Sequence, residues 1–439
     1  MIIAKRLKGK AIATWLGPTG EAARRALTRA RQRITNAPSR LDFYVDIGDP
    51  MSYLTAQAVT RLAAAYPIEL GVHVVTPPAS DVDPAPTLRT KHAVRDAREV
   101  AAYWNVEFPA QKEADSNLVR DVGTSLIKDR PAADQLRAVT ELTGAMWAGD
   151  RKALGQLLLK YGTESSTSIP PVLNAAYGEL RKAGHYQGAM LHYGGVWYWG
   201  IDRLPYLEAV LAAEHGARPP VVAPRDEAER GPLALSEKPL TCELWFSFRS
   251  PYSYLALERI EQVLAPHGIP LVLKPIAPMI ARGLPMPQVK QMYIVRDAKR
   301  EADRLGIAFG ELCDPRGKGV DNCLAIAHWA AKRGPAELMA FVRSAMRGIW
   351  SEALDVAEYV DLKQIVERTG LSWDEAQAAL GDPEAAKVAH ANATDLAVFS
   401  LWGVPSLRCG DFVAWGQDRL PLLADRLRRH ALVTVKPAS

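Results

Sequence analysis

Three blocks of sequence each occur twice in this chain of 439 residues, and they keep their order. The pairs are LDFYVDIGDPMSYLTAQAV (41–59) with CELWFSFRSPYSYLALERI (242–260), VRDAREVAAYWNVEF (94–108) with VRDAKREADRLGIAF (295–309), and WGIDRLPYLEAVL (199–211) with WGQDRLPLLADRL (415–427). Ordered repeats indicate a duplicated unit, and two copies are too few for a solenoid. The length also exceeds what one hydrophobic core usually holds. We therefore predict two homologous globular domains in tandem.

Each copy also repeats one order of predicted elements. A β-rich run meets a proline turn, an amphipathic helix follows, and a second strand completes a βαβ unit. These segments are LDFYVDI, MSYLTAQAVTRLAAAY and IELGVHVVTP in the first copy, and LTCELWFSF, YSYLALERIEQVLAPHG and PLVLKPIAP in the second. A long helical stretch, which includes WDEAQAALGDPEAAKVAHANATDLA, precedes two short strands around a glycine turn and a final helix. The order predicts an α/β class, a thioredoxin-like fold with an all-helical insertion domain in each copy.

The segment between the copies, EHGARPPVVAPRDEAERGPLALSEKP, is rich in proline and charge, which is typical of a linker. The predicted divisions are a basic N-terminal segment (1–40), a first thioredoxin-like domain (41–214), a linker (215–239), a second thioredoxin-like domain (240–432) and a tail (433–439). The N-terminal segment contains one acid, Glu21, among many Lys and Arg residues. We expect a basic helix that packs on the first domain; an organellar presequence is the alternative.

Composition excludes several classes of protein. With 48% hydrophobic and 23% charged residues, the chain has the balance of an ordinary globular protein. No apolar run approaches the ~18 residues of a membrane span, and charges interrupt the start of the chain where a signal peptide needs its apolar core. The nine histidines show no ligand spacing, so we expect no metal site. Only the basic N-terminal segment favours nucleic acid, which we do not expect as a partner.

The four cysteines all lie in the second copy, and none forms a C-x-x-C pair. They are Cys242, Cys313, Cys323 and Cys409. A disulfide framework or a dithiol redox motif is therefore not expected, and a reducing cytoplasm fits this usage. Cys409 lies close to the segment GVPSL, and a regulatory role for it stays open.

Three motifs of the second copy, FSFRSPYSYLA, GVPSL and WGQDRL, resemble in order and spacing those of 2-hydroxychromene-2-carboxylate isomerases and kappa-class glutathione transferases. Both groups lie in the thioredoxin-fold disulfide oxidoreductase superfamily. The resemblance covers residues 240–432 and, more faintly, 41–214. It implies glutathione as cofactor, bound where Ser250 replaces the redox cysteine of the oxidoreductases.

The chemistry of Ser250 is consistent with this role. A hydroxyl at the start of a helix can donate a hydrogen bond to a sulfur, and the positive end of the helix favours a thiolate. The alternative is that Ser250 only caps the helix, with Pro251 at its first position.

The resemblance assigns further residues to glutathione. Pro405 matches the cis-proline of the family, and the backbone of Val404 pairs with the cysteinyl part. Gln417 and Asp418 match positions that bind the γ-glutamyl end, and Lys290 matches a lysine near the glutathione carboxylates. Each has a structural alternative, namely a trans proline on an edge strand, a helix N-cap at Asp418 and a solvated lysine.

The substrate end of the site is expected to be apolar and aromatic. Tyr252, Tyr254 and Trp415 are the candidates, with a place in the core as the alternative for each. Asn322 matches a family asparagine beside the substrate cavity. The loop ARGLPMPQ lacks the Gly-Asn dipeptide usual in the family, so the resemblance does not support substrate contacts there.

The two copies differ at the positions that carry the chemistry. The counterparts, second copy first, are Ser250 and Asp49, Pro405 and Ala189, Lys290 and Arg89, and Tyr293 and His92. A carboxylate repels a thiolate instead of donating to it. We therefore expect the first copy to be a degenerate, non-catalytic domain that packs with the second as an intramolecular pseudo-dimer. Because Asp202 persists in this copy, we expect the aspartate of the WG-x-DRL motif to cap the last helix.

These observations favour a glutathione-dependent isomerase in aromatic catabolism, acting on a small molecule. The thiolate would add to an unsaturated keto acid, the new single bond would rotate, and elimination would return the thiol. The alternatives are a conjugating glutathione transferase, a thioredoxin-fold oxidoreductase, and a non-catalytic glutathione-binding or scaffold protein.

Overall fold

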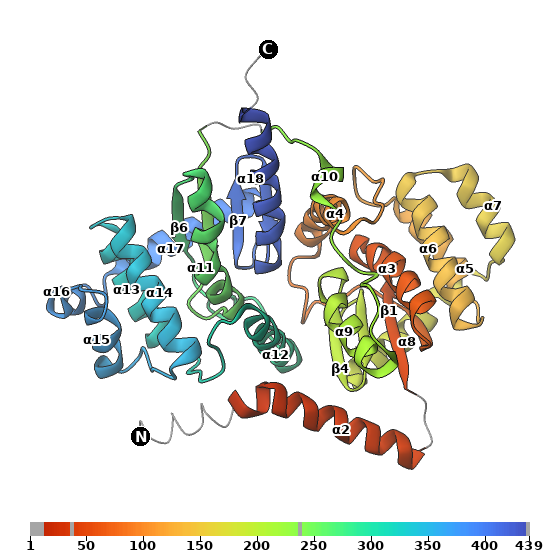
Figure 1. The fold of residues 1–439 in the computed structure, drawn as a ribbon, viewed down its shortest axis with the longest axis horizontal. Coiled ribbons are helices and arrows are strands. Elements are labelled where there is room, and N and C mark those ends of the chain that lie inside the picture. Colours follow the sequence, from red (N-terminus) through yellow and green to blue (C-terminus); the bar gives the residue numbers. More distant parts are fainter. Residues whose placement is uncertain (1–12, 36–38, 236–238, 436–439) are drawn as a thin grey trace. The chain divides into compact units, whose positions relative to one another are not determined.

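The computed structural model describes residues 13–35, 39–235 and 239–435 (Figure 1). Contacts divide them into two units. The C-terminal unit comprises the described residues within 1–21, 231–286 and 291–439, and the N-terminal unit comprises those within 22–230 and 287–290. The division after Arg230 lies inside the segment for which we predicted a linker.

The N-terminal unit is built on a four-stranded sheet in the order β2-β1-β3-β4. The strands are β1 (Arg40–Asp46), β2 (Glu69–Val75), β3 (Met190–Tyr193) and β4 (Val196–Trp199). β1 is parallel to β2 and antiparallel to β3. The helices are most of α2 (Pro18–Thr35), α3 (Pro50–Ala65), α4 (Pro86–Trp104), α5 (Ser116–Leu126), α6 (Ala132–Ala148), α7 (Arg151–Tyr161), η1 (Ser166–Ser168), α8 (Ile169–Ala183), η2 (Ile201–Arg203), α9 (Leu204–His215) and α10 (Glu227–Arg230).

The C-terminal unit is built on a second sheet in the order β6-β5-β7-β8. The strands are β5 (Cys242–Phe246), β6 (Leu271–Pro275), β7 (Ser406–Cys409) and β8 (Phe412–Trp415). The helices are α11 (Pro251–Leu264), η3 (Ala265–His267), η4 (Ile280–Arg282), most of α12 (Gln288–Leu305), α13 (Lys318–Ala331), α14 (Pro335–Ser351), α15 (Tyr359–Glu367), α16 (Trp373–Ala378), α17 (Pro383–Val398), η5 (Gln417–Arg419) and α18 (Leu420–Val435). α13 to α17 are the helical insertion between β6 and β7 (Figure 1).

The two sheets share one strand order, with a parallel βαβ unit followed by an antiparallel hairpin and a helix. The predicted thioredoxin-like fold is therefore confirmed, and the sheet of the N-terminal unit has the same strand order. One hydrogen bond recurs at matching positions: Ser52 Oγ accepts from Asp46 N at 3.1 Å, and Ser253 Oγ accepts from Ser247 N at 3.4 Å. Both bonds tie the strand end to the following helix. A duplication event explains these parallels and stays our prediction.

Buried apolar side chains explain why β5 lies inside the C-terminal unit. Trp245 and Phe246 are fully buried in this strand, and Phe248 is fully buried just beyond it. Trp245 also packs with Leu396 and Leu401 from the segment before β7. Central strands covered on both faces are typically apolar, and CELWF follows this pattern except at the half-buried Glu243. The core thereby fixes the point at which β5 turns into α11.

The predicted helical stretch WDEAQAALGDPEAAKVAHANATDLA divides into two helices. α16 ends at Ala378 and α17 begins at Pro383. Between them Gly381 adopts a positive φ of 83°, a backbone conformation that glycine favours, and Asp382 accepts a capping bond from Glu384 N at 2.9 Å. A glycine followed by an aspartate cap and a proline therefore breaks the stretch, which hydrophobic periodicity alone did not reveal.

The basic helix α2 contacts the first domain, as we expected. Its Arg25 is only 8% exposed and belongs to the N-terminal unit. Arg25 Nη2 donates to Tyr198 Oη at 2.6 Å, and Tyr198 lies in β4. Residues 1–12 of the predicted basic segment lie outside the described residues. In the part of the chain that the structure describes, we find no helix with both the length and the apolarity needed to cross a bilayer.

Candidate active site

Ser250 lies where β5 turns into α11. It is the N-cap of this helix, with extended φ and ψ of −109° and 113°, and its Oγ accepts from Ser253 N at 3.1 Å. The same hydroxyl donates to the backbone oxygen of Val404 at 3.3 Å. Ser250 therefore caps the helix, as the structural alternative proposed. It also reaches the loop before β7, and a plain cap does not require that second contact.

The loop before β7 contains the second predicted element of the site. The peptide bond between Val404 and Pro405 is cis, as the resemblance implied, and Val404 is half-buried. Gly403 approaches Trp415 so closely that an added Cβ would lie 2.3 Å from the indole Cζ2. The Trp415 ring in turn contacts Trp402, with 4.7 Å between the ring centroids. Trp415 thus packs directly against this loop.

An arginine that sequence reasoning missed precedes Ser250. Arg249 binds the Asp314 carboxylate in a bidentate pair, with Nε at 2.7 Å and Nη2 at 2.9 Å. Arg316 Nε donates to the same carboxylate at 2.7 Å. Two guanidinium groups therefore share one carboxylate beside the N-terminus of α11, which leaves a local excess of positive charge. The signal was absent from the sequence because Arg249 and Asp314 lie 65 residues apart.

A second cation belongs to the same region. Arg282, at the end of η4, donates to Ala277 O at 3.1 Å and to Trp402 O at 2.6 Å. Burial lowers the pKa of this guanidinium, and no carboxylate pairs with it among the described residues. Arg282 lies in the loop ARGLPMPQ, where the family dipeptide is missing. It is therefore a candidate for binding an anion beside the loop of Pro405.

The side chain of Gln417 is buried and forms its hydrogen bonds with other residues of the protein. Its side chain is 1% exposed; Oε1 accepts from Arg259 Nη1 at 2.5 Å, and Nε2 donates to Glu301 Oε2 at 2.9 Å and to Asp418 Oδ1 at 2.5 Å. These bonds favour a structural role for the Gln417 side chain. Asp418 is half-buried, and its recognition of the γ-glutamyl end stays a prediction.

The two tyrosines of α11 differ in environment. Tyr254 is 1% exposed, donates to Ala308 O at 2.8 Å, and burial raises its pKa to about 12. The structure thus favours the core role for Tyr254. Tyr252 is half-buried and donates to Asp297 Oδ2 at 2.7 Å. Its contact with substrate stays a prediction.

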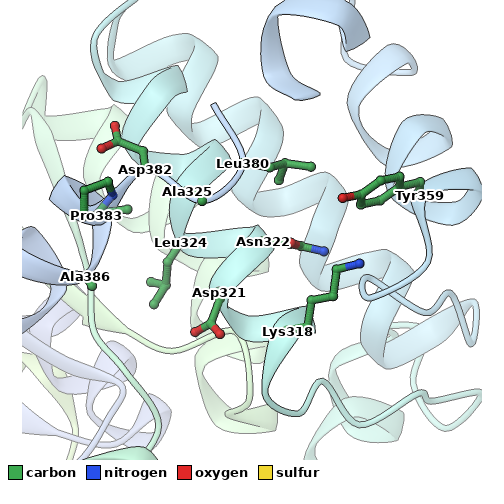
Figure 2. Close-up of a pocket in the computed structure, with 12 residues that line it drawn as sticks. Lys318, Asp321, Asn322, Leu324, Ala325, Tyr359, Leu380, Asp382, Pro383 and Ala386 are labelled. Atoms are coloured by element: carbon green, nitrogen blue, oxygen red, sulfur yellow. The ribbon is translucent and has the colours of Figure 1, made fainter. Parts of the chain in front are cut away.

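Asn322 lines a pocket in the helical insertion, which Figure 2 shows in close-up. The pocket has a volume of about 440 Å³ and is lined by residues of α13, of α15 and of the start of α17. Asn322 Nδ2 donates to Val356 O at 2.9 Å, and Lys318 Nζ lies 4.5 Å from the centre of the Tyr359 ring. The lining includes none of the residues around Ser250. Asn322 therefore borders a cavity, but its link to the Ser250 site stays a prediction.

Lys290 belongs with the N-terminal unit, unlike Ser250. Its Nζ donates to Val82 O in the same unit at 2.8 Å. Burial lowers the pKa of this ammonium, while Asp83 and Asp81 raise it less. Its predicted contact with the glutathione carboxylates stays a prediction.

The corresponding turn of the N-terminal unit has the opposite character. Asp49 caps α3 and accepts from Met51 N at 3.3 Å and from Ser52 N at 3.2 Å. Asp46, at the end of β1, is 3% exposed. Burial raises the pKa of both carboxyls, that of Asp46 to about 7. Ala189 occupies the position of Pro405, and Val404–Pro405 is the one cis peptide bond among the described residues.

The environment of Asp46 predicts a pH-dependent stability. Burial and the Asp49 charge raise its pKa from 3.8 to about 7, although Arg89 opposes this rise. Between these values the unfolded state binds fewer protons than the folded state, so the free energy of unfolding falls as pH rises from about 4 to about 7. Asp46→Asn should flatten this part of the profile, measured as urea midpoints at several pH values. Parallel profiles for the two proteins would show that Asp46 does not titrate in this range.

One sequence prediction about the repeated WG-x-DRL motif is wrong. The N-cap of α9 is Arg203, without a side-chain capping bond, so Asp202 does not cap that helix. Asp202 Oδ1 instead accepts from Trp104 Nε1 at 3.1 Å. Asp202 lies within a short 3₁₀ turn, η2, which places it one residue before the capping position of α9. In the N-terminal unit this aspartate therefore ties α4 to the turn before α9.

In the C-terminal unit, the order of the strands, the helix N-cap at Ser250 and the cis-proline loop agree with a match to a known protein family. Residues 241–428 match the family described as the DSBA-like thioredoxin domain. The C-terminal half of this chain carries a DSBA-like thioredoxin domain. No group of three His, Cys, Asp or Glu side chains suited to a metal ion occurs within residues 13–35, 39–235 and 239–435.

Three known proteins are similar to this chain. The 2-hydroxychromene-2-carboxylate isomerase of Sphingobium xenophagum is 26% identical over 195 residues, which are 43% of this chain and 97% of that protein. A solved structure of a 2-hydroxychromene-2-carboxylate isomerase is 22% identical with a TM-score of 0.40, covering 45% of this chain and all of that one. A "probable DsbA oxidoreductase" from Streptomyces coelicolor is 21% identical with a TM-score of 0.36, covering 46% and 93%. The family match and the similarity in sequence to the Sphingobium xenophagum isomerase together support a place for the DSBA-like domain among thioredoxin-fold oxidoreductases and isomerases.

Proposed function

We propose that the C-terminal unit is a glutathione-dependent isomerase of unsaturated keto acids from aromatic catabolism. The observation that carries the proposal is the Ser250 hydroxyl at the N-terminus of α11, 3.3 Å from the oxygen of Val404 and next to Pro405. Glutathione, held by Ser250 and the backbone of Val404, would supply a thiol for addition to the conjugated alkene of the substrate and for elimination after rotation. The similarity to the isomerase of Sphingobium xenophagum supports this choice of reaction.

Ser250 is suited to hold a thiolate. Its proton points toward Val404 O, and rotation about the Cβ–Oγ bond redirects it toward a ligand without moving the backbone. The capping bond from Ser253 N leaves the hydroxyl proton available for this donation. The N-terminus of α11 adds a positive potential that stabilises the anion and lowers the pKa of a bound thiol.

Two arginines give this site a preference for anions. Arg249 adjoins Ser250, and Arg282 reaches the same loop through Trp402 O. Glutathione and a keto acid both carry carboxylates, which guanidinium groups bind through charge-assisted hydrogen bonds. We assign Arg282 to a carboxylate because its described partners are backbone oxygens alone.

Arg282→Met should raise the KM for the keto acid, or the Kd for glutathione, by about 10- to 100-fold, because a hydrogen bond to a charged group is lost. Arg282→Lys keeps the charge and should lose less. The control is Arg137→Met in α6 of the N-terminal unit, where the arginine side chain is 60% exposed. Steady-state kinetics and calorimetry measure the two constants. Equal constants for the Met variant and the parent protein would remove Arg282 from the site.

The N-terminal unit is proposed as a non-catalytic partner domain. Asp49 accepts hydrogen bonds where Ser250 also donates one, so an ionised Asp49 offers no donor to a thiolate. Asp46 adds a second buried carboxyl to the same turn. This unit lacks the donor on which the proposed site depends.

Product analysis tests the isomerase and its alternatives. The protein is incubated with glutathione and an unsaturated keto acid, and the products are separated by chromatography. An isomerised acid with glutathione fully recovered supports the proposal. A stable thioether adduct would instead identify a glutathione transferase, and binding without turnover would identify a glutathione-binding protein. An oxidoreductase is disfavoured because Ser250 and Asp49 occupy the positions of the redox cysteine.

A further inference from the structure

Two cysteines face each other at the end of the second sheet. Cys242 begins β5, Cys409 ends β7, and they are direct partners in the antiparallel ladder. Both are fully buried, and their thiols share a hydrogen bond. Ser250 follows the other end of β5, so this pair is separate from the proposed site. Neither thiol has a role in the proposed isomerisation.

The register of the strands suits a covalent bond between these sulfurs. Directly opposed residues of antiparallel strands have Cα atoms about 4.5 or 5.5 Å apart. Disulfides span Cα distances of about 4.4 to 6.8 Å. The next opposed pair along β5 and β7, Glu243 and Arg408, supports this register through an ion pair, with Arg408 Nη1 3.2 Å from Glu243 Oε2. Lys274 Nζ of β6 lies 2.6 Å from Glu243 Oε1 on the other side. The sulfurs can therefore bond without a shift of the strands.

We propose that Cys242 and Cys409 form a reversible cross-strand disulfide when the protein meets a peroxide. One thiol loses its proton, its sulfur attacks a peroxide oxygen, and the O–O bond breaks to give a sulfenic acid and water. The second sulfur then displaces the hydroxyl of the sulfenic acid, and a second water leaves with its proton. Two thiols and one hydrogen peroxide thus become one disulfide and two waters, with the sulfurs oxidised and the peroxide reduced.

The surroundings of the pair decide which oxidant reaches it. The hydrogen bond that the Cys242 thiol donates to Cys409, together with burial, raises the pKa of Cys242 well above its usual value, so thiolate is scarce and oxidation is slow. Thr241 and Asp411, each near one of the cysteines in the chain, are exposed, so a small opening of the strand ends admits a water-sized molecule. Hydrogen peroxide is small and neutral enough to use this path.

The test is oxidation of the intact chain. The folded protein is treated with hydrogen peroxide, the peroxide is destroyed by catalase, and remaining thiols are alkylated in denaturant. The alkylated forms of Cys242 and Cys409 should both disappear, and mass spectrometry should find a peptide that links Cys242 to Cys409. Dithiothreitol should restore both thiols.

Three variants make the result decisive. Cys242→Ser and Cys409→Ser should each abolish the linked peptide, whereas Cys323→Ser should keep it. Cys323 is the matched control because it is fully buried, and burial raises the pKa of its thiol, but it lies in helix α13 and not in the sheet. Two outcomes would overturn the proposal. One is full alkylation of Cys242 and Cys409 at peroxide doses that oxidise Cys313; the other is a linked peptide that joins different cysteines.

Discussion

Replacement of Ser250 by aspartate is expected to lower isomerase turnover by about 100- to 1,000-fold, the range seen when one donor to a reacting anion is removed. The C-terminal unit should remain folded. Aspartate accepts hydrogen bonds but cannot donate one when ionised, and its charge repels a thiolate. Turnover is measured with glutathione and an unsaturated keto acid, and folding is measured by circular dichroism and urea unfolding.

The chain itself shows that this substitution preserves the helix. Asp49 occupies the corresponding turn and caps α3 through Met51 N and Ser52 N. Loss of a cap costs about 1 kcal/mol, so Ser250→Ala removes the cap and the donor together, whereas Ser250→Asp removes only the donor. The matched control is Asp49→Ser, which should leave turnover unchanged. Normal turnover in the Ser250→Asp variant would reduce Ser250 to a helix cap.

Gly403→Ala is expected to have the second largest effect. An added Cβ would lie 2.3 Å from Trp415 Cζ2, so the indole or the loop before Pro405 must move. Overpacking of this kind costs about 1–3 kcal/mol of unfolding free energy. Because Val404 follows directly, we also expect at least about tenfold weaker glutathione binding, which corresponds to about 1.4 kcal/mol.

The control for Gly403→Ala is the same substitution at a glycine whose added Cβ meets no neighbouring atom. A Cβ at Gly155, within α7, would meet nothing within 4 Å. Gly155→Ala should therefore stabilise the protein by about 0.5–1 kcal/mol through helix propensity. Urea unfolding measures both variants, and calorimetry measures glutathione binding. If Gly403→Ala unfolds and binds like the parent protein, the packing of this loop on Trp415 does not matter for the site.

The sequence predicted the framework of the site because that framework is local. Alternating or continuous apolar runs, prolines after strands and a serine before a proline are read within a few residues, and β5, α11 and the cap at Ser250 follow them. The hairpin of β7 and β8 follows from its glycine turn in the same way. These signals depend on backbone geometry, which neighbouring residues largely determine.

The contacts that give the site its charge were not predictable in this way. Arg282 meets Trp402 O across 120 residues, and Gln417 meets Arg259 across 158, so only the folded chain reveals them. The interpretation of Asp202 as a cap was wrong for a local reason, because a 3₁₀ turn displaced it from the helix start. The resemblance to the family indicated which positions could bind glutathione or substrate. The packing around each position decides whether its side chain is available to a ligand.

Calorimetric titration of the full chain with glutathione shows whether the N-terminus of α11 binds this thiol. We expect one binding site per chain, unchanged affinity in Asp49→Ser, and a loss of affinity in Ser250→Asp. This pattern would assign glutathione to the N-terminus of α11 alone. Two sites per chain, or affinity in Ser250→Asp equal to that of the parent protein, would contradict it.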